Sequence, residues 1–210
     1  MGVPIMRMFL RLAVVLAMLA TAAAPLRAQD SSACVGGTPS AAIKIEVFSD
    51  YQCPACQQFY LQTMRNVLSE YADKNKACVV YREFPLSQHA HARTAARYGV
   101  AALHLGVRQW SQVTDALFLG QEGWAASGDV ESVVAKVLSP SDMAAVRKEL
   151  QSPAALDANI EADYQLGVQR GVSSTPTFFV TANGKTQKFA AAYTYPILKR
   201  YLDSLLAAGN

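Results

Sequence analysis

The 210-residue chain lacks the patterns that mark several large functional classes. It contains no Gly-rich phosphate loop and no serine nucleophile elbow, so nothing in it indicates a nucleotide-binding protein or a serine hydrolase. It has no internal repeat, and its four cysteines include one close pair, whereas a four-cysteine zinc site normally uses two. Of its three histidines, His89 and His91 are two residues apart, a spacing that does not place them on one helix face. A histidine metal site is therefore not expected.

Charge is scarce and becomes balanced once the N-terminal segment is set aside. The chain has 19 Lys and Arg against 16 Asp and Glu, and residues 1–28 hold three arginines and no acidic residue. The rest therefore has 16 residues of each sign, without a basic patch or a long charge run, and a nucleic-acid partner is not expected. About 180 residues, in a chain that is 51% hydrophobic, are enough for one domain of ordinary size.

Residues 1–28 are predicted to be a signal peptide. Arg7 and Arg11 accompany the start of an apolar run, Leu12–Ala24, which small residues follow, and we place the cleavage site after Ala28. An uncleaved membrane anchor is the alternative, but the run is shorter than the roughly 20 residues that a spanning helix needs. No other run of the required length follows. We therefore expect a protein exported to the periplasm or another compartment outside the cytoplasm.

The most informative pattern is Cys53-Pro54-Ala55-Cys56, at the junction of a predicted strand and a predicted helix. Residues 43–48 favour a strand, and a helical pattern begins at Gln57. Two thiols at this spacing can close a small disulfide ring, and the helix dipole favours the thiolate of the first. The pattern predicts a redox-active pair. Because Gln57 rather than His follows the second cysteine, c-type haem attachment does not fit.

The remaining two cysteines, Cys34 and Cys78, are expected to form a structural disulfide. Disulfides persist in exported proteins, and a Cys-x-x-Cys at a helix start most naturally pairs with itself. The bridge would tie the N-terminal segment to the strand that begins at Cys78. Two unrelated thiols, or a lipid-modified Cys34, are the alternatives.

The apolar periodicity predicts a strand, a helix and a strand, then a block of helices, then a hairpin and a closing helix. The first three are expected at 42–48, from the cysteine pair to about Lys74, and at 78–84, which is typical of a right-handed parallel βαβ unit. The alanine-rich block should contain helices near 89–105, 109–119, 129–138, 141–150 and 153–170, with Trp110 and Trp124 packed among them. The last elements are expected at 177–182, 185–190 and 196–206, with Asn183-Gly184 as the hairpin turn.

Three segments together resemble the DsbA-like thioredoxin-fold oxidoreductases, in particular the exported bacterial proteins with a helical domain inserted in the fold. They are Phe48–Cys56, Arg82–Leu86 and Thr175–Val180. The resemblance spans about Ile43 to Leu206, nearly the whole chain after the predicted signal peptide. It implies an α/β thioredoxin-like fold (βαβ … ββα) with an α-helical insertion.

The expected domain organisation follows from this resemblance and from the periodicity. Residues 29–41 should form a leader loop, and residues 42–87 and 172–210 should form the thioredoxin-like domain. Residues 88–171 should form the inserted helical subdomain.

The resemblance also implies a role for each residue at the site. Cys53 should be the attacking thiol and Cys56 the buried resolving thiol. Thr175-Pro176 should be a cis peptide that turns the Thr175 backbone toward the pair, the alternative being a trans proline that starts a strand. Four residues are expected to contact the substrate: Pro54, Ala55, Thr175 and Pro176.

The chain departs from the family pattern at two positions. The strongly oxidising DsbA has a His between its cysteines, and Ala55 neither donates a hydrogen bond nor carries charge, so a very low thiol pKa is not predicted. Family members often carry a buried Glu six residues before the first cysteine, where this chain has Val47. Glu46 lies one residue earlier, on the opposite strand face, so we expect it to contact Lys44 or solvent. Asp50 is interpreted equally as a turn or cap residue and as a proton relay.

These observations predict an exported protein thiol–disulfide oxidoreductase that needs no cofactor and no metal and acts as a monomer. It should donate the Cys53–Cys56 disulfide, through a mixed disulfide, to unfolded or partly folded secreted proteins that carry free cysteines. A membrane redox partner should then reoxidise it. A reductase or isomerase of the same fold is the first alternative, although family isomerases have a dimerisation domain where this chain has only a short segment. A Cys-x-x-Cys metal-binding module is the alternative from a different class.

Overall fold

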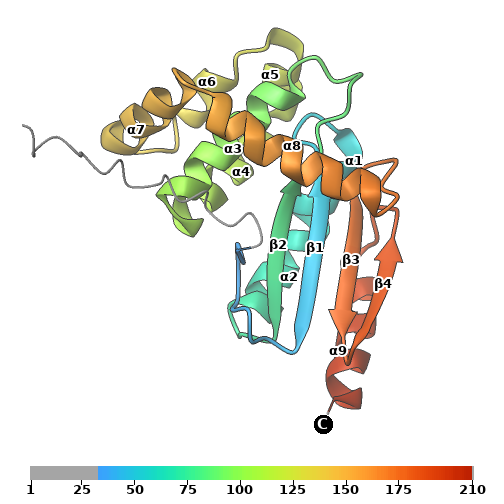
Figure 1. The fold of residues 1–210 in the computed structure, drawn as a ribbon. Coiled ribbons are helices and arrows are strands. Elements are labelled where there is room, and N and C mark those ends of the chain that lie inside the picture. Colours follow the sequence, from blue (N-terminus) through green and yellow to red (C-terminus); the bar gives the residue numbers. More distant parts are fainter. Residues whose placement is uncertain (1–32, 210) are drawn as a thin grey trace, which may run out of the picture.

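The computed structural model describes residues 33–209, which form one sheet with helices on both faces and beyond one end (Figure 1). The predicted signal peptide, its cleavage site after Ala28 and the start of the leader loop lie outside the described residues. The strands are β1 (Ile43–Ser49), β2 (Ala77–Glu83), β3 (Thr177–Ala182) and β4 (Lys185–Phe189).

The sheet has the strand order β2-β1-β3-β4. β1 pairs with β2 in parallel, in a register that places Ser49 beside Glu83, and β1 pairs with β3 antiparallel. A two-residue turn with positive φ at both Asn183 and Gly184 joins β3 to β4, as the Asn-Gly pair predicts. The carboxyl ends of β1 and β2 therefore lie at the same edge of the sheet as the start of β3.

The first helical segment follows β1 and is not a regular α-helix throughout. It consists of α1 (Pro54–Phe59), η1 (Tyr60–Met64), α2 (Arg65–Val67) and η2 (Leu68–Ala72), where η1 and η2 are π-helical turns that the sequence did not indicate. Asn75, expected to stop this helix, has a φ of 55° just beyond its end. The chain then enters β2, which completes the parallel βαβ unit.

Six helices lie between β2 and β3, and one follows β4. They are α3 (Ala92–Leu105), α4 (Val107–Leu119), α5 (Gln121–Ser127), α6 (Val130–Val134), α7 (Pro140–Leu150), α8 (Ala154–Gln169) and α9 (Tyr195–Ala208). In Figure 1, α3 to α7 gather beyond the carboxyl ends of β1 and β2, whereas α8 extends from that group across one sheet face. α1, α2 and α9 lie on the opposite face.

Both faces of β1 are buried along most of its length, and four of its seven residues are apolar. Ile43, Ile45 and Val47 belong to the main core with residues of α2 and α9 such as Val67 and Leu202. On the other face, Phe48 packs with a smaller cluster that contains Phe84, Val172 and Phe179, with Tyr164 of α8 against it. Trp110 and Trp124 are buried among the helices, as expected.

Several predicted boundaries were wrong. The helix expected near 89–105 begins at Ala92, because residues 87–91 form turns. The helix expected near 129–138 is limited to Val130–Val134, and α5 was missed altogether. Glycines flank α5 on both sides and interrupt its apolar pattern, so the segment resembled a loop.

Candidate active site

Cys53 and Cys56 lie at the N-terminus of α1, directly beyond β1. Cys53 has an extended backbone and precedes Pro54, whose fixed φ suits the first helical position. The backbone N–H of Gln57 donates to the Cys53 carbonyl over 3.1 Å, which closes the first turn. Both cysteines are free thiols, with Cys53 7% exposed and Cys56 1% exposed. Cys53 is thus the thiol nearer to solvent, and Cys56 lies one helical turn deeper.

The residues before β3 lie against this pair. The Thr175-Pro176 peptide bond is cis, as the resemblance implied. The Cys53 thiol donates to the Thr175 carbonyl, with 3.5 Å between Sγ and the oxygen. The Thr175 hydroxyl is buried and has no hydrogen-bond partner among residues 33–209. The sequence separates these residues by more than a hundred positions, and the antiparallel pairing of β1 with β3 brings them together.

The two thiols have opposite pKa shifts. A hydrogen bond with the Cys56 side chain, assisted by the Thr175 side chain and the backbone N–H groups of Ala55 and Cys56, lowers the pKa of Cys53 to about 5. Burial raises the pKa of Cys56 well above its ordinary value, and the neighbouring Cys53 adds to the rise. At neutral pH the reduced site therefore holds a Cys53 thiolate beside a Cys56 thiol. The low pKa of Cys53 was not expected from Pro54 and Ala55, because its causes are neighbours from the fold and the backbone.

Three glutamine side chains connect the cysteine loop to the helical block, and the sequence analysis assigned no role to any of them. Gln121 of α5 donates to the carbonyls of Tyr51 and Cys53 over 2.7 and 3.1 Å. Gln57 donates to the Phe118 carbonyl over 2.6 Å, and Gln52 accepts from the backbone N–H of His91 over 2.7 Å. The helical block thus fixes the backbone on both sides of Cys53. A glutamine carries no motif, so this role could not be identified from the sequence.

Asp50 organises the turns that surround the site. It is 1% exposed and accepts hydrogen bonds from the backbone N–H groups of Gln52 and Leu86 over 2.7 and 2.8 Å. Its second oxygen also lies 2.7 Å from Nδ1 of His89. Asp50 therefore has the turn role, one of its two expected interpretations, and its oxygens are occupied by the loops that follow β1 and β2.

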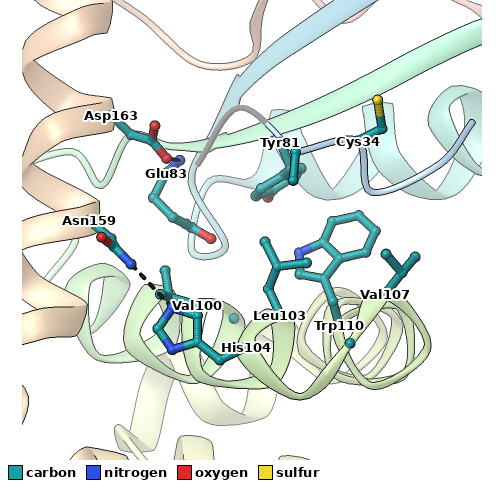
Figure 2. Close-up of a pocket in the computed structure, with 13 residues that line it drawn as sticks. Cys34, Tyr81, Glu83, Val100, Leu103, His104, Val107, Trp110, Asn159 and Asp163 are labelled. Atoms are coloured by element: carbon teal, nitrogen blue, oxygen red, sulfur yellow. Dashed lines mark hydrogen bonds between the residues drawn. The ribbon is translucent and has the colours of Figure 1, made fainter. Parts of the chain in front are cut away.

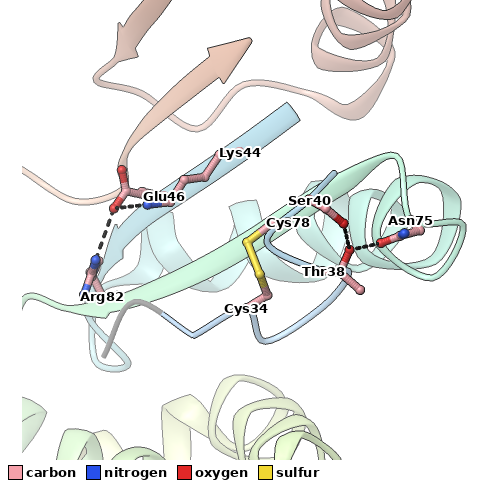
Figure 3. Close-up of a disulfide and its surroundings, with 8 residues drawn as sticks. All are labelled: Cys34, Thr38, Ser40, Lys44, Glu46, Asn75, Cys78 and Arg82. Carbon is pink, nitrogen blue, oxygen red and sulfur yellow. Dashed lines mark hydrogen bonds and ion pairs between the residues drawn. A yellow bond between two sulfur atoms is a disulfide. The ribbon is translucent and has the colours of Figure 1, made fainter. Parts of the chain in front are cut away.

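Glu46 lies on the opposite face of the sheet from Cys56, as its strand position predicted. It contacts Lys44, the first of its two expected partners, and at 8% exposed it does not face solvent. It forms an ion pair with Arg82 over 3.1 Å (Figure 3) and a second with Arg170 over 3.0 Å. Arg82 also pairs with Asp163 of α8 over 2.9 Å. The missed signal was the Arg in the Arg82–Leu86 segment, which is buried beside Glu46.

Cys34 and Cys78 form a disulfide between the segment before β1 and strand β2 (Figure 3). Their Cα atoms are 5.4 Å apart, and 44 positions separate them in the sequence. Beside the bridge, Val35 donates to the Val79 carbonyl and Val79 donates to the Gly36 carbonyl, over 2.7 and 2.9 Å. The segment before β1 is therefore attached to β2 by covalent and hydrogen bonds, and is more ordered than the expected leader loop.

Within residues 33–209, no group of three or more His, Cys, Asp or Glu side chains is arranged to hold a metal ion. In the same range, no helix is long and apolar enough to cross a membrane.

The two residues between the cysteines are open to solvent. Pro54 is exposed and Ala55 is partly exposed, so both are accessible beside Cys53.

The sequence profile of the family described as Thioredoxin matches residues 30–204. The chain is also similar to the probable disulfide bond formation protein D of Bacillus cereus, with 24% identity over 152 residues that cover 70% of this chain and 69% of that protein. Among solved structures it is similar to alpha-DsbA1 of Wolbachia pipientis, with 20% identity and a TM-score of 0.69 over 82% of this chain and 89% of that one. It is likewise similar to DsbA2 of Pseudomonas aeruginosa, with 22% identity and a TM-score of 0.66 over 81% and 92% of the two chains. These likenesses show a shared fold.

Proposed function

The chain belongs to the thioredoxin family and is a DsbA-like thiol–disulfide oxidoreductase, and from this we propose that it oxidises exported proteins by donating its Cys53–Cys56 disulfide. The observation that supports oxidation of the substrate, rather than its reduction, is the pKa of Cys53, which is lowered to about 5. A thiolate that its surroundings stabilise makes the reduced form of the pair more favourable, so the disulfide form becomes a stronger oxidant. Such a thiolate is also a good leaving group.

The transfer of the disulfide takes two exchange steps. A substrate thiolate attacks Sγ of Cys53, a sulfur–sulfur bond forms between them, and the Cys53–Cys56 bond breaks with its electron pair on Cys56. The buried Cys56 then takes up a proton, in agreement with the raised pKa of its thiol. A second substrate thiolate attacks the substrate sulfur of the mixed disulfide and displaces Cys53 as a thiolate. The substrate loses two electrons and two protons, and the pair gains the two electrons.

Four residues form the proposed substrate contact around Cys53: Pro54, Ala55, Thr175 and Pro176. Pro54 and Ala55 are accessible at the start of α1 and offer an apolar surface. The cis bond lies next to Cys53, and an extended substrate segment beside it would present its cysteine to Sγ of Cys53. Binding of this kind uses backbone contacts and therefore suits many substrate sequences.

The proposed setting is the periplasm, or an equivalent oxidising compartment, reached by means of the signal peptide in residues 1–28. The proposed substrates are unfolded or partly folded exported proteins with free cysteines, and a membrane redox partner would restore the disulfide. We retain residues 42–87 with 172–210 as the thioredoxin-like unit and residues 88–171 as its insertion. The three glutamine contacts support a positioning role for that insertion at the cysteine loop.

Transfer of the disulfide to a peptide with two thiols tests this proposal. The oxidised protein should lose the Cys53–Cys56 disulfide as the peptide gains one, and a Cys53→Ser variant should be inactive. A variant with both Cys34→Ala and Cys78→Ala retains the pair and should transfer normally, which makes it the control. Faster reduction of a disulfide-containing protein by the reduced form than oxidation of the peptide by the oxidised form would instead favour the reductase.

A further inference from the structure

Glu83, at the end of β2, is a buried carboxylic acid to which the exchange chemistry assigns no role. It is 4% exposed, and its Oε2 has no hydrogen-bond partner among residues 33–209. Tyr81, two residues earlier on the same strand face, has a buried hydroxyl that also lacks a partner at hydrogen-bonding geometry in this range. Buried polar atoms without partners are rare in folded proteins, and two on one wall call for an explanation.

Both residues line one cavity of about 250 Å³ between β2, α3 and α8 (Figure 2). Figure 2 shows Glu83 reaching from its strand toward Val100 and Leu103 of α3. The far wall is formed by His104, whose Nε2 lies 3.2 Å from Nδ2 of Asn159. A cavity of this size with polar side chains on its wall has room for several water molecules, which can bond to the hydroxyl of Tyr81 and the carboxyl of Glu83.

A row of polar side chains continues from this cavity to the redox pair. Ser49 lies beside Glu83 in the register of β1 with β2, and its hydroxyl lowers the pKa of both the Cys56 thiol and the Tyr81 hydroxyl. The ring of Tyr81 stacks on that of Tyr51, with centroids 5.5 Å apart. Cys56, Ser49, Tyr81 and Glu83 therefore lie in sequence along one side of the sheet.

Gly99 of α3 allows the Glu83 carboxyl to lie against the helix. A Cβ at this position would come within 2.7 Å of the Tyr51 hydroxyl and 3.1 Å of Oε1 of Glu83. The glycine thus leaves room for both polar groups at the point where the row meets α3.

We infer that Glu83 exchanges the proton of Cys56, through Ser49, Tyr81 and water in the adjoining cavity. The inference rests on the proposed function, whose first exchange step leaves a thiolate on Cys56. In that step the Glu83 carboxyl gives up its proton, the row passes a proton to Cys56, and water in the cavity returns one to Glu83. In the reverse direction Glu83 first releases its proton to water in the cavity, its carboxylate then accepts the proton of Cys56 through the row, and the Cys56 thiolate attacks Cys53.

The charges around Glu83 favour its protonated form at rest. Burial raises the pKa of Glu83 well above its ordinary value, and repulsion from Asp163 and Asp50 adds to the rise. Asp163 also accepts from the backbone N–H of Glu83 over 3.2 Å. The titratable and charged groups that face Glu83 or its cavity are Asp50 after β1, Tyr51, Tyr81, Arg82, Asp163 of α8 and His104 of α3, and His104 pairs with Glu149. Glu83 thus holds a proton for Cys56 and acts through it, without touching the substrate.

The test is the pH profile of mixed-disulfide resolution. The protein is prepared with glutathione on Cys53, and release of glutathione by Cys56 is followed over a range of pH. Glu83→Gln keeps the shape and removes the exchangeable acid, so it should slow release about 100-fold at neutral pH and leave only the ionisation of Cys56 in the profile. Glu83→Asp should restore part of the rate. Glu46→Gln, which changes a similarly buried acid on the other sheet face, should retain the wild-type profile.

The outcomes separate this inference from the proposed function. A wild-type protein that transfers no disulfide to the dithiol peptide overturns the function, whereas normal transfer with an unchanged Glu83→Gln profile overturns only the inference. If Glu83→Gln does not fold, the inference can be tested on the wild-type protein labelled with ¹³C-glutamate. Infrared difference spectra between its disulfide and dithiol forms then report the protonation of glutamic acid. We expect a protonated glutamic acid band at neutral pH that changes between the disulfide and dithiol forms. The absence of any such band would contradict the inference.

Discussion

Sγ of Cys53 lies 3.5 Å from the carbonyl oxygen of Thr175, on the N-terminal side of the cis bond to Pro176. The Thr175 hydroxyl, which has no other partner in residues 33–209, can donate to the same sulfur once it is ionised. The thiolate is thereby stabilised by the hydroxyl of a residue from a distant part of the chain. This relationship connects the fold to the oxidising direction that we propose.

Removal of that hydroxyl should weaken the thiolate. Thr175→Val is expected to raise the pKa of Cys53 by about one unit, because a hydrogen bond to a charged group contributes about 1.5–3 kcal/mol and one pKa unit corresponds to about 1.4 kcal/mol. The ultraviolet absorbance of the thiolate during a pH titration measures the shift. Thr177→Val is the matched control, since the Thr177 hydroxyl donates to the Ser174 carbonyl. An equal shift in both variants would contradict this assignment.

The stability of the reduced form should depend on pH through Cys53. Its pKa falls from an ordinary value of 9.0 to about 5 on folding, so between these values the unfolded chain binds one more proton than the native protein. The free energy of unfolding should therefore rise by about 1.4 kcal/mol per pH unit across this window, and this contribution is lost as the pH falls through 5. The oxidised form has no such contribution. Urea unfolding of both forms at several pH values measures the difference, and parallel curves would disprove it.

Gln121 should hold the cysteine loop in place. Gln121→Ala leaves the buried carbonyls of Tyr51 and Cys53 without their donor, which should cost about 2 kcal/mol of unfolding free energy. It should also slow disulfide transfer, because the loop that carries Cys53 loses its support. Gln58 is exposed and, among residues 33–209, its side chain bonds to Gln62, so Gln58→Ala is the control and should change stability by less than about 0.5 kcal/mol. Denaturant unfolding and the peptide assay give the two readouts.

The Cys34–Cys78 bridge should contribute to stability and leave the chemistry unchanged. Its sequence separation of 44 residues predicts a loss of about 4 kcal/mol when both cysteines become alanine, from the chain-entropy relation. The double variant should therefore unfold at a lower urea concentration and still transfer its disulfide. A large loss of transfer in protein that remains folded would show that the bridge also supports the redox site.

The sequence allowed much of the fold and the Cys53–Cys56 pair to be predicted because their signals are local, and the pairing of Cys34 with Cys78 followed because these two cysteines remained. The strand before Cys53, the Asn183-Gly184 turn and the Cys-x-x-Cys spacing can each be recognised from a few neighbouring residues. The segment Thr175-Pro176 was placed beside Cys53 only through family resemblance. No periodicity could have shown that contact, since it depends on how β3 pairs with β1.

The groups that tune the site could not be predicted in the same way. Gln121 lies on a short helix between glycines, and its importance follows from two backbone carbonyls about seventy positions away. Glu83 reads as an ordinary charged residue near a strand end, and its burial results from the packing of α3 and α8 over β2. Glu46 contacts Lys44 as expected, but its burial was missed for a related reason, because Arg82 and Arg170 close over it.

The most direct test of the account is the reduction potential of the Cys53–Cys56 pair, measured at equilibrium with glutathione in the Cys34→Ala, Cys78→Ala variant. That variant removes the second disulfide, so only the redox pair titrates. The lowered pKa of Cys53 predicts an oxidising potential, near the value of about −120 mV known for DsbA. A potential near the value of about −270 mV known for thioredoxin would contradict the proposed direction and favour a reductase.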